Sequence, residues 1–322
     1  MTDRQTAHLL SVQDRFSSTR PVDTGFKFLT LVAALTVGIL LLSIASTLTV
    51  QAWPAITDLG WNFLVGTQWN SVPGRETYGA LPMILGTLAS SGLALMMALP
   101  LGLGSAIALA EDFLPRPGRQ IGVFMVELLA AIPSVVYGLW GIFILIPALL
   151  QVESWLHTHL GWIPLFSTPP MGPGLLPASV VLAIMILPMI AAISRDTLTA
   201  LPQELRQASL GLGATRWGTL LRVLIPAAFP GILGGVMLAL GRALGETMAV
   251  TMLIGNANQI PRSLWSPTNT IASLLATQFT EARDLQIAAL MYAALVLLLM
   301  TLGINVLADL IVRRVRAPYL EG

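Results

Sequence analysis

Six long apolar segments constrain the fold of this chain more than any other feature. A helix needs about 20 residues to cross the roughly 30 Å hydrocarbon core of a bilayer. Continuous apolar runs of this length also differ from the alternating pattern of membrane β-strands. We therefore predict an all-α integral membrane protein with six transmembrane helices. The segments cover approximately residues 28–50, 80–110, 121–149, 177–194, 228–255 and 285–312.

The composition agrees with a membrane protein. Of the 322 residues, 55% are hydrophobic and only 10% are charged, whereas a soluble domain has about 25% charged residues. The chain contains no cysteine, which excludes disulfides and cysteine-ligated metals. His157 and His159 are two residues apart and would point to different faces of a helix. We therefore predict no metal site and no cofactor.

The distribution of positive charge predicts the orientation in the membrane. Thirteen of the 17 lysines and arginines fall in the two terminal tails and in the loops between the second and third and between the fourth and fifth apolar segments. Cytoplasmic segments are enriched in Lys and Arg. Both termini should therefore be cytoplasmic. The remaining four are Arg75, Arg262 and Arg283 on the outer side and Arg242 within the membrane.

This orientation predicts how the chain is divided. We expect a cytoplasmic N-terminal tail over 1–27, a six-helix domain over 28–312 and a cytoplasmic C-terminal tail over 313–322. Within the domain, 195–227 would form a cytoplasmic loop. The first apolar segment exceeds the 7 to 15 residues of a signal-peptide core, and a polar tail precedes it, so we expect a retained helix.

The loop at 195–227 is expected to contain two short helices. Its sequence is RDTLTALPQELRQASLGLGATRWGTLLRVLIPA. Pro202 and Glu204 suit the first turn of one helix, and Thr215 could cap a second helix that reaches Ile225. The two glycines of the intervening GLGA permit a sharp change of direction. Such a surface suits contact with a cytoplasmic partner, although an amphipathic helix resting on anionic membrane lipid is an alternative.

Arg242 lies near the centre of the fifth apolar segment, where an isolated charge costs at least about 2.5 kcal/mol. Glu246 is four residues away, so on a continuous helix the two would share one face, about 6 Å apart. Two interpretations remain. The pair could be a permanent salt bridge that fixes helix packing. Alternatively, Arg242 binds a travelling anion through its planar guanidinium and Glu246 is the resting counter-ion. We favour the second, because intramembrane charges are usually functional.

The third apolar segment contains other polar groups. Glu127 should lie shallow enough to reach water or a cytoplasmic arginine, and a direct role in a pathway is the alternative. Pro133 can kink its helix by freeing a backbone carbonyl. Ser134 and Tyr137 could bond to the freed groups, and the kink could line a cavity.

The loop resembles the cytoplasmic signature of ABC importer permeases, which reads EAA, three residues, Gly, nine residues and then I-x-L-P. Alignment on Gly213 places Gln207, Ala208 and Ser209 at the EAA positions and Pro226 at the final proline. Gln207 and Ser209 depart from the signature. The resemblance implies that the loop contacts an ATPase. The residues expected at this contact are Gln207, Ala208, Ser209, Gly211, Gly213, Ala214, Thr215 and Pro226.

More of the chain resembles the permeases of the phosphate (Pst) transport system. The matching segments are YGALPMILGT at 78–87, ELLAAIPSVVYGLWG at 127–141 and GRALGETMAV at 241–250. The tryptophan-rich WNFLVGTQWNSVPG before the first of these resembles the PstC-type subunit. The resemblance implies the ABC type I importer permease fold. It also supports a substrate pathway that contains Arg242, Glu246, Glu127, Ser134 and Tyr137.

The resemblance further implies a heteromeric phosphate importer in the bacterial cytoplasmic (inner) membrane. Its other parts would be a PstA-type permease, two ATP-binding PstB-type subunits and a periplasmic phosphate-binding protein, with no nucleic acid. The only lysine, Lys27, lies outside any G-x4-G-K-[ST] motif. We therefore expect ATP hydrolysis on separate subunits.

Other functions are considered as alternatives. A PstA-type subunit, or a permease for another oxyanion such as molybdate or sulfate, is the nearest within transport. A membrane-embedded enzyme would need a convergent catalytic set, but only one acid lies deep in the apolar segments, so we predict no catalytic residues. A sensor would need a soluble signalling domain, and no stretch is long enough for one.

Overall fold

The computed structural model describes residues 20–72, 74–111 and 113–320. Residues 1–19 and 321–322 of the two expected tails therefore lie outside the described residues. The chain divides into two units, 1–51 and 52–322, which are described separately. Within the described residues, six helices are long and apolar enough to cross a membrane, which confirms the predicted number.

The described part of the first unit belongs to a single helix, α2 (Arg20–Leu59), which continues into the second unit. Most of its apolar side chains between residues 24 and 51 are exposed within the chain, including Leu29, Ile39 and Leu42. A helix that is apolar on all sides and exposed in its own chain suits contact with lipid or with another membrane helix. The first predicted segment is therefore confirmed as a candidate span.

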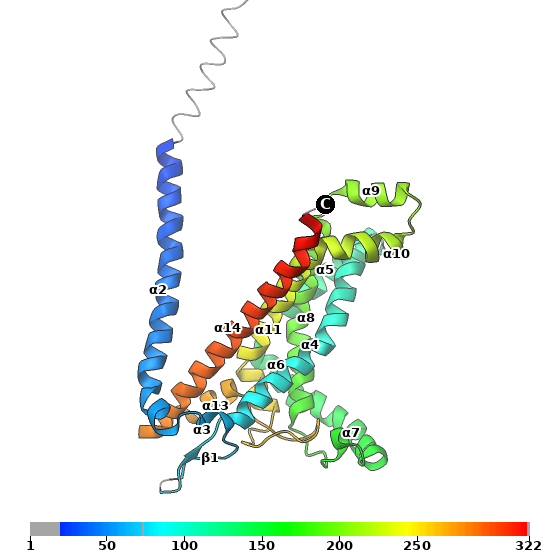
Figure 1. Cartoon of the computed structure of the whole chain (residues 1–322). Helices are drawn as coiled ribbons and strands as arrows, with labels where there is room; N and C mark the ends of the chain where they lie inside the picture. The colour runs from blue at the N-terminus through cyan, green and yellow to red at the C-terminus, as the bar shows by residue number, and fades with distance from the viewer. Residues whose placement is uncertain (1–19, 73, 112, 321–322) are drawn as a thin grey trace, which may run out of the picture. The chain divides into compact units, whose positions relative to one another are not determined.

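The second unit contains the other five spans (Figure 1). Two of them contain a π-helical stretch, η1 or η3, between α-helical parts. The spans are α4 (Leu81–Ala110), α6 (Ser134–Trp140) continued by η1 (Gly141–Leu145) and α7 (Ile146–Leu160), α8 (Leu175–Thr199), α10 (Arg216–Thr219) continued by η3 (Leu220–Leu224) and α11 (Ile225–Gly245), and α14 (Asp284–Leu320).

The third predicted segment, 121–149, is not one continuous helix. It is divided at Ile132 and Pro133, both in extended conformation, with α5 (Arg116–Ala131) before the break and the span itself after it. Proline has no N–H to donate and disfavours helical conformation in the residue before it. The apolar character continues across the break, so hydropathy alone does not reveal it.

The fifth predicted segment, 228–255, is displaced along the chain. The helix begins earlier, at Arg216, and ends at Gly245. Glu246 is extended, with a ψ angle of 124°, and the short helix α12 (Met248–Leu253) follows. Arg242 is therefore in the last turn of α11 rather than near the centre of a span.

Helix α8 is the most buried span and packs along both α4 and α11. Small residues permit this close packing. A Cβ atom added at Gly102 of α4 would lie 3.0 Å from the Ile190 side chain, and one added at Gly235 of α11 would lie 3.0 Å from that of Ile193. The main apolar cluster joins these helices to α6 and α12.

The two ends of the second unit differ in structure (Figure 1). One end carries α9 (Gln203–Gly211), α10 and the C-terminal part of α14. The opposite end carries the short antiparallel pair of β1 (Trp69–Asn70) and β2 (Thr77–Tyr78). The other short elements are α3 (Asn62–Val65), α13 (Ile271–Gln278) and the 3-10 helix η2 (Pro164–Phe166).

Candidate coupling site and charged pathway

The loop at 195–227, which we call the inner loop, folds as two helices at a sharp corner. Helix α9 follows Pro202, and α10 begins after Thr215, whose hydroxyl accepts a hydrogen bond of 3.1 Å from the Gly218 N–H. This cap confirms the prediction for Thr215. Gly213 makes the corner possible because its φ angle of +86° lies in the left-handed region that favours glycine. The second helix continues beyond Ile225 into α11 without a break.

Ser209 stiffens this corner. Its hydroxyl lies 2.9 Å from the Thr219 hydroxyl, and both side chains are buried. The Ser209 carbonyl also accepts a hydrogen bond of 3.1 Å from the Ala214 N–H. The serine at this signature position therefore joins α9 to α10, a contact that an alanine side chain would not provide.

The residues expected to contact an ATPase do not all lie on one surface. Pro226 is partly buried in the first turn of α11, within the continuous helix from Arg216 to Gly245. Ala214 is partly buried and Ser209 is buried. The exposed members are Gln207, Ala208, Gly211, Gly213 and Thr215.

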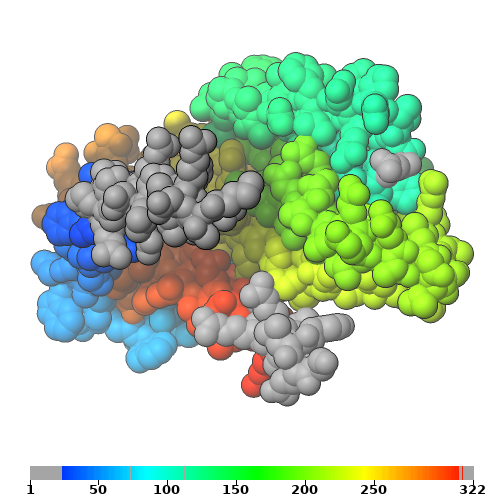
Figure 2. Space-filling view, turned by 90° about the horizontal axis from the view of Figure 1, so that it is seen from above, coloured from blue at the N-terminus to red at the C-terminus, as the bar shows by residue number. Residues whose placement is uncertain are grey.

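An exposed apolar residue at the corner was not identified from the sequence. Leu212 is 90% exposed and is next to Gly213. Its exposure depends on the backbone conformation at the corner, which the hydrophobic pattern does not contain. In the end-on view, the yellow-green surface of α9 and α10 borders the teal surface that includes α5 (Figure 2). An exposed apolar side chain on such a surface suits a contact with another protein.

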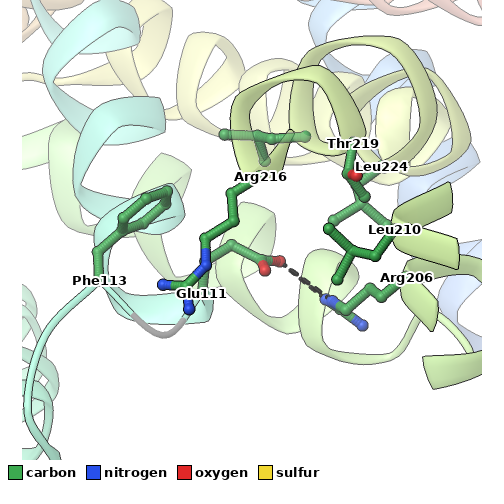
Figure 3. Close-up of a pocket in the computed structure, with 8 residues that line it drawn as sticks. Glu111, Phe113, Arg206, Leu210, Arg216, Thr219 and Leu224 are labelled. Carbon is green, nitrogen blue, oxygen red and sulfur yellow. Dashed lines mark hydrogen bonds and ion pairs between the residues drawn. The ribbon is translucent and has the colours of Figure 1, made fainter. Parts of the chain in front are cut away.

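Beneath α9, the sequence also failed to identify an ion pair. Arg206 lies 2.9 Å from Glu111, the residue that ends α4 (Figure 3). The same guanidinium donates to the carbonyl groups of Leu198, at 2.8 Å, and Leu201, at 3.2 Å. The paired residues are 95 positions apart in the chain. Only the assignment of both to the cytoplasmic side could have suggested that they are close.

The ion pair lies between two pockets. The first, shown in Figure 3, is formed by the end of α4, α9 and the start of the fifth span, and Phe113, Leu210 and Arg216 line it beside the pair. The second is lined by Arg119, Gln203 and other polar residues. Arg119 also donates to the Ala110 carbonyl at 3.2 Å.

The geometry predicted for Arg242 and Glu246 is wrong. The helix ends at Gly245, so the two residues do not share a continuous helical face, and no ion pair joins them in the described part of the chain. The Glu246 carboxylate instead accepts a hydrogen bond of 3.4 Å from the Ala249 N–H, at the start of α12. A carboxylate suits this position because the first N–H groups of a helix have no partner within it.

Arg242 is exposed within the single chain. A guanidinium without a carboxylate partner among the described residues suits an anion or an acidic group of another chain.

Tyr137 bonds to the carbonyl freed by Pro133, as predicted. Its hydroxyl donates to the Leu129 carbonyl at 2.9 Å, four residues before the proline. The Ser134 side chain is partly buried, and its hydroxyl makes no hydrogen bond among the described residues. Glu127 is exposed on α5, a helix with no buried side chain, and the described residues provide no ion-pair partner for it.

The two histidines contact backbone carbonyls instead of a shared site. The Nδ1 atom of His157 lies 2.8 Å from the Phe166 oxygen, and that of His159 lies 2.8 Å from the Trp155 oxygen.

Comparisons with known proteins agree with the fold. Residues 98–317 match the family model described as "Binding-protein-dependent transport system inner membrane component". The chain is 44% identical to the phosphate transport system permease protein PstC of Mesorhizobium japonicum, over 92% of this chain and 91% of that protein. It is 41% identical to the PstC protein of Haemophilus influenzae, over 92% of this chain and 94% of that protein.

Among solved structures, the chain resembles the MetNI methionine ABC transporter in an inward-facing conformation. The TM-score is 0.54 at 20% identity, with 72% of this chain and 94% of that chain covered. Six spans with a helix–corner–helix loop on one side therefore define a transmembrane permease of the ABC importer type. The chain belongs to the family of binding-protein-dependent transport system inner membrane components, in the branch of the PstC phosphate transport permeases.

Proposed function

We propose that this chain is the PstC-type permease subunit of an ATP-driven importer of inorganic phosphate. The observation that carries the proposal is 44% identity, over 92% of the chain, to a protein named as a phosphate transport permease. The exposed corner at Gly213 supports it, because this corner is where the ABC permease signature and the two helices coincide.

The proposed importer has several further parts. A PstA-type permease forms the other half of the pathway, two PstB-type subunits hydrolyse ATP, and a periplasmic binding protein delivers phosphate. The complex lies in the bacterial inner membrane with 195–227 and both tails, 1–27 and 313–322, on the cytoplasmic side. The membrane domain covers 28–312.

Arg242 is the proposed phosphate ligand in the pathway. It lies on the last turn of α11, and no carboxylate of the described residues forms an ion pair with it. Tyr137 belongs to the same proposed pathway. Phosphate oxygens fit the planar donors of a guanidinium. We also include Glu246, Glu127 and Ser134 in the proposed pathway, with Glu246 positioning the α11–α12 junction.

The exposed corner of the inner loop is the proposed contact for the ATPase. Gln207, Ala208, Gly211 and Thr215 surround the corner, and Leu212 is its most exposed apolar side chain. ATP binding and hydrolysis would move this corner and thereby move the spans around the pathway. Ser209, Gly213, Ala214 and Pro226 would support the local structure.

Reconstitution tests the proposed function. The chain is co-expressed with the products of neighbouring transport genes, purified through a tag on this chain, and incorporated into liposomes with ATP on the ATPase side. Labelled phosphate, sulfate and molybdate are supplied separately with the binding protein. We expect ATP-dependent phosphate accumulation that excess unlabelled phosphate abolishes. Accumulation of sulfate or molybdate in place of phosphate would contradict the proposed substrate.

A further inference from the structure

Arg206 joins three structural elements at the inner end of the second unit. It belongs to α9 and forms an ion pair with Glu111 at the end of α4 (Figure 3). It also donates to the carbonyl groups of Leu198, in the last turn of α8, and of Leu201, just after that helix. About one fifth of each charged side chain is exposed, 21% for Arg206 and 18% for Glu111. Counterions therefore reach the pair less easily than they reach a fully exposed surface pair, but they still screen it in part.

Helix electrostatics explain why these charges occur together. A carboxylate at the C-terminus of α4 is unfavourable because the helix dipole is negative there. The Leu198 carbonyl, in the last turn of α8, accepts a long backbone hydrogen bond of 3.4 Å from the Leu201 N–H, and a carbonyl oxygen can accept a second donor. One guanidinium binds both groups, because it is a cation with several donors in a fixed plane. Removal of Arg206 would leave Glu111 without its counter-charge and the Leu198 carbonyl without this donor.

The elements that Arg206 joins are themselves tightly packed. Helices α4 and α8 approach closely at Gly102, and α8 approaches α11 where a Cβ atom added at Gly231 would lie 2.4 Å from the Thr197 side chain. On the other side of Arg206, the hydroxyls of Ser209 and Thr219 join α9 to α10. A displacement of α9 would therefore be transmitted to the helices that carry the proposed pathway.

A ring contact provides a second connection between α4 and the corner. Phe113, just after α4, stacks on Trp217 of α10 with ring centroids 5.2 Å apart and an interplanar angle of 28°. The end of α4 thus contacts both helices of the corner, by charge at Arg206 and by aromatic packing at Trp217. Two separated contacts restrict rotation of the corner about either one.

We propose that Arg206 and Glu111 form a strut that fixes α9 to the ends of α4 and α8 throughout the transport cycle. Arg206 is then a positioning residue: it converts movement of the ATPase contact into movement of the spans. This inference rests on the proposed function, because it assumes that an ATPase moves the corner. Without the strut, α9 would move with the ATPase while the spans lag behind.

The first experiment measures the number of phosphate ions transported per ATP in the reconstituted complex. For Arg206→Gln and Glu111→Gln, we expect ATP hydrolysis to continue and phosphate per ATP to fall about tenfold, within the usual range for coupling between sites. The KM for the loaded binding protein should not change. For Arg206→Lys, the phosphate transported per ATP should lie between the values for Arg206→Gln and for the unaltered chain, because an ammonium keeps the charge but lacks the planar set of donors.

A matched control is available at the same end of the molecule. Asp196→Asn breaks the ion pair of Arg195 with Asp196, whose side chain is 66% exposed, and should leave phosphate per ATP unchanged. Equal losses in Asp196→Asn and Arg206→Gln would overturn the strut. So would an Arg206→Gln complex that assembles and transports normally. If Arg206→Gln fails to assemble, Arg206→Lys and the crosslink described next decide the question.

Crosslinking tests whether α9 and α4 must separate. The chain contains no cysteine, so Glu111→Cys/Arg206→Cys introduces one unique pair of thiols. A short bifunctional thiol reagent should restore the phosphate per ATP that the double variant has lost. If the crosslink instead abolishes transport while the uncrosslinked variant transports, α9 moves relative to α4 and the strut is wrong.

Measuring the distance between α9 and α4 tests the strut independently of which anion is transported. Spin labels at two exposed positions, Gln203 on α9 and Leu101 on α4, report their separation in the complex with and without trapped nucleotide. We expect one narrow distance distribution in both states, and a broad one in Arg206→Gln. A nucleotide-dependent shift in the unaltered background would overturn the strut. A constant distance without phosphate transport would contradict the proposed substrate alone.

Discussion

The Glu246 side chain caps the start of α12, although its charge and its place near Arg242 in the sequence suggest a counter-ion. Its carboxylate accepts from the Ala249 N–H at the start of α12 and makes no ion pair with Arg242 among the described residues. The end of α11 at Gly245 creates this arrangement, because the next residue is extended. The guanidinium of Arg242 is thus left available for a group outside its own helix.

Two substitutions distinguish capping by Glu246 from a counter-ion role. Glu246→Gln keeps an oxygen that can accept from Ala249, whereas Glu246→Ala removes it. We expect Glu246→Ala to lower the stability of the α11–α12 junction by about 0.5–2 kcal/mol, as for other helix caps, and Glu246→Gln to retain most of that stability and of the phosphate uptake. Thermal unfolding in detergent and uptake in liposomes check this. Full stability but no uptake in Glu246→Gln would instead show that the charge is required.

Arg242→Gln tests the proposed phosphate ligand. Hydrogen bonds to charged groups contribute about 1.5–3 kcal/mol, so its loss from the pathway should reduce phosphate uptake roughly 10- to 100-fold. Arg195→Gln is the control, since Arg195 pairs with Asp196 at the inner end, and it should transport normally. Assembly is checked by co-purification of the partner subunits. An assembled Arg242→Gln complex with full uptake would exclude Arg242 from phosphate binding.

At the scale of the elements, local chemistry decides what the sequence can predict. Pro202, Gly213 and Thr215 act on their own backbone, so the corner of the inner loop could be predicted. The break at Pro133 was anticipated only as a kink, because apolar residues continue on both sides of it. The contact of Arg206 with Glu111 could not be predicted, since it depends on how helices 95 residues apart in sequence pack together.

The corner provides a prediction with an internal control. Gly213 has a φ angle of +86°, and no atom lies within 4 Å of an added Cβ, so Gly213→Ala would introduce backbone strain alone. We expect a loss of about 1–2 kcal/mol in the stability of the corner and weaker co-purification of the ATPase. Gly104 in α4, away from the proposed contact, also has open space around an added Cβ but no positive φ angle. Gly104→Ala should retain the ATPase, and a similar loss in both variants would contradict the backbone explanation.

At the scale of the whole second unit, α4 is held at both ends. Its inner end contacts α9 through Glu111 and Arg206. Near its outer end, Gly86 lies directly against the backbone of Asn269, and the Thr87 hydroxyl accepts a hydrogen bond of 3.0 Å from the Ile271 N–H. The chain between α12 and α13 is therefore fixed to α4 by its backbone.

Gly86→Ala tests this outer contact. A Cβ atom at Gly86 would lie 2.0 Å from the Asn269 carbonyl oxygen, so the backbone must move. Overpacking of this kind destabilises by about 1–3 kcal/mol, and we expect a lower unfolding temperature and a lower yield of folded protein. Gly92→Ala, on the same helix with open space at its Cβ position, should behave like the unaltered chain. Equal unfolding temperatures for the two variants would contradict the close contact.

The two attachments of α4 differ in their response to ionic strength. The contact of Gly86 with the Asn269 backbone involves no net charge, so added salt leaves it intact, whereas a partly exposed ion pair such as that of Glu111 and Arg206 is weakened by counterions. Concentrated salt should therefore loosen α4 at the end that carries Glu111, while the opposite end stays fixed. At high ionic strength, the phosphate transported per ATP should therefore fall before the protein unfolds.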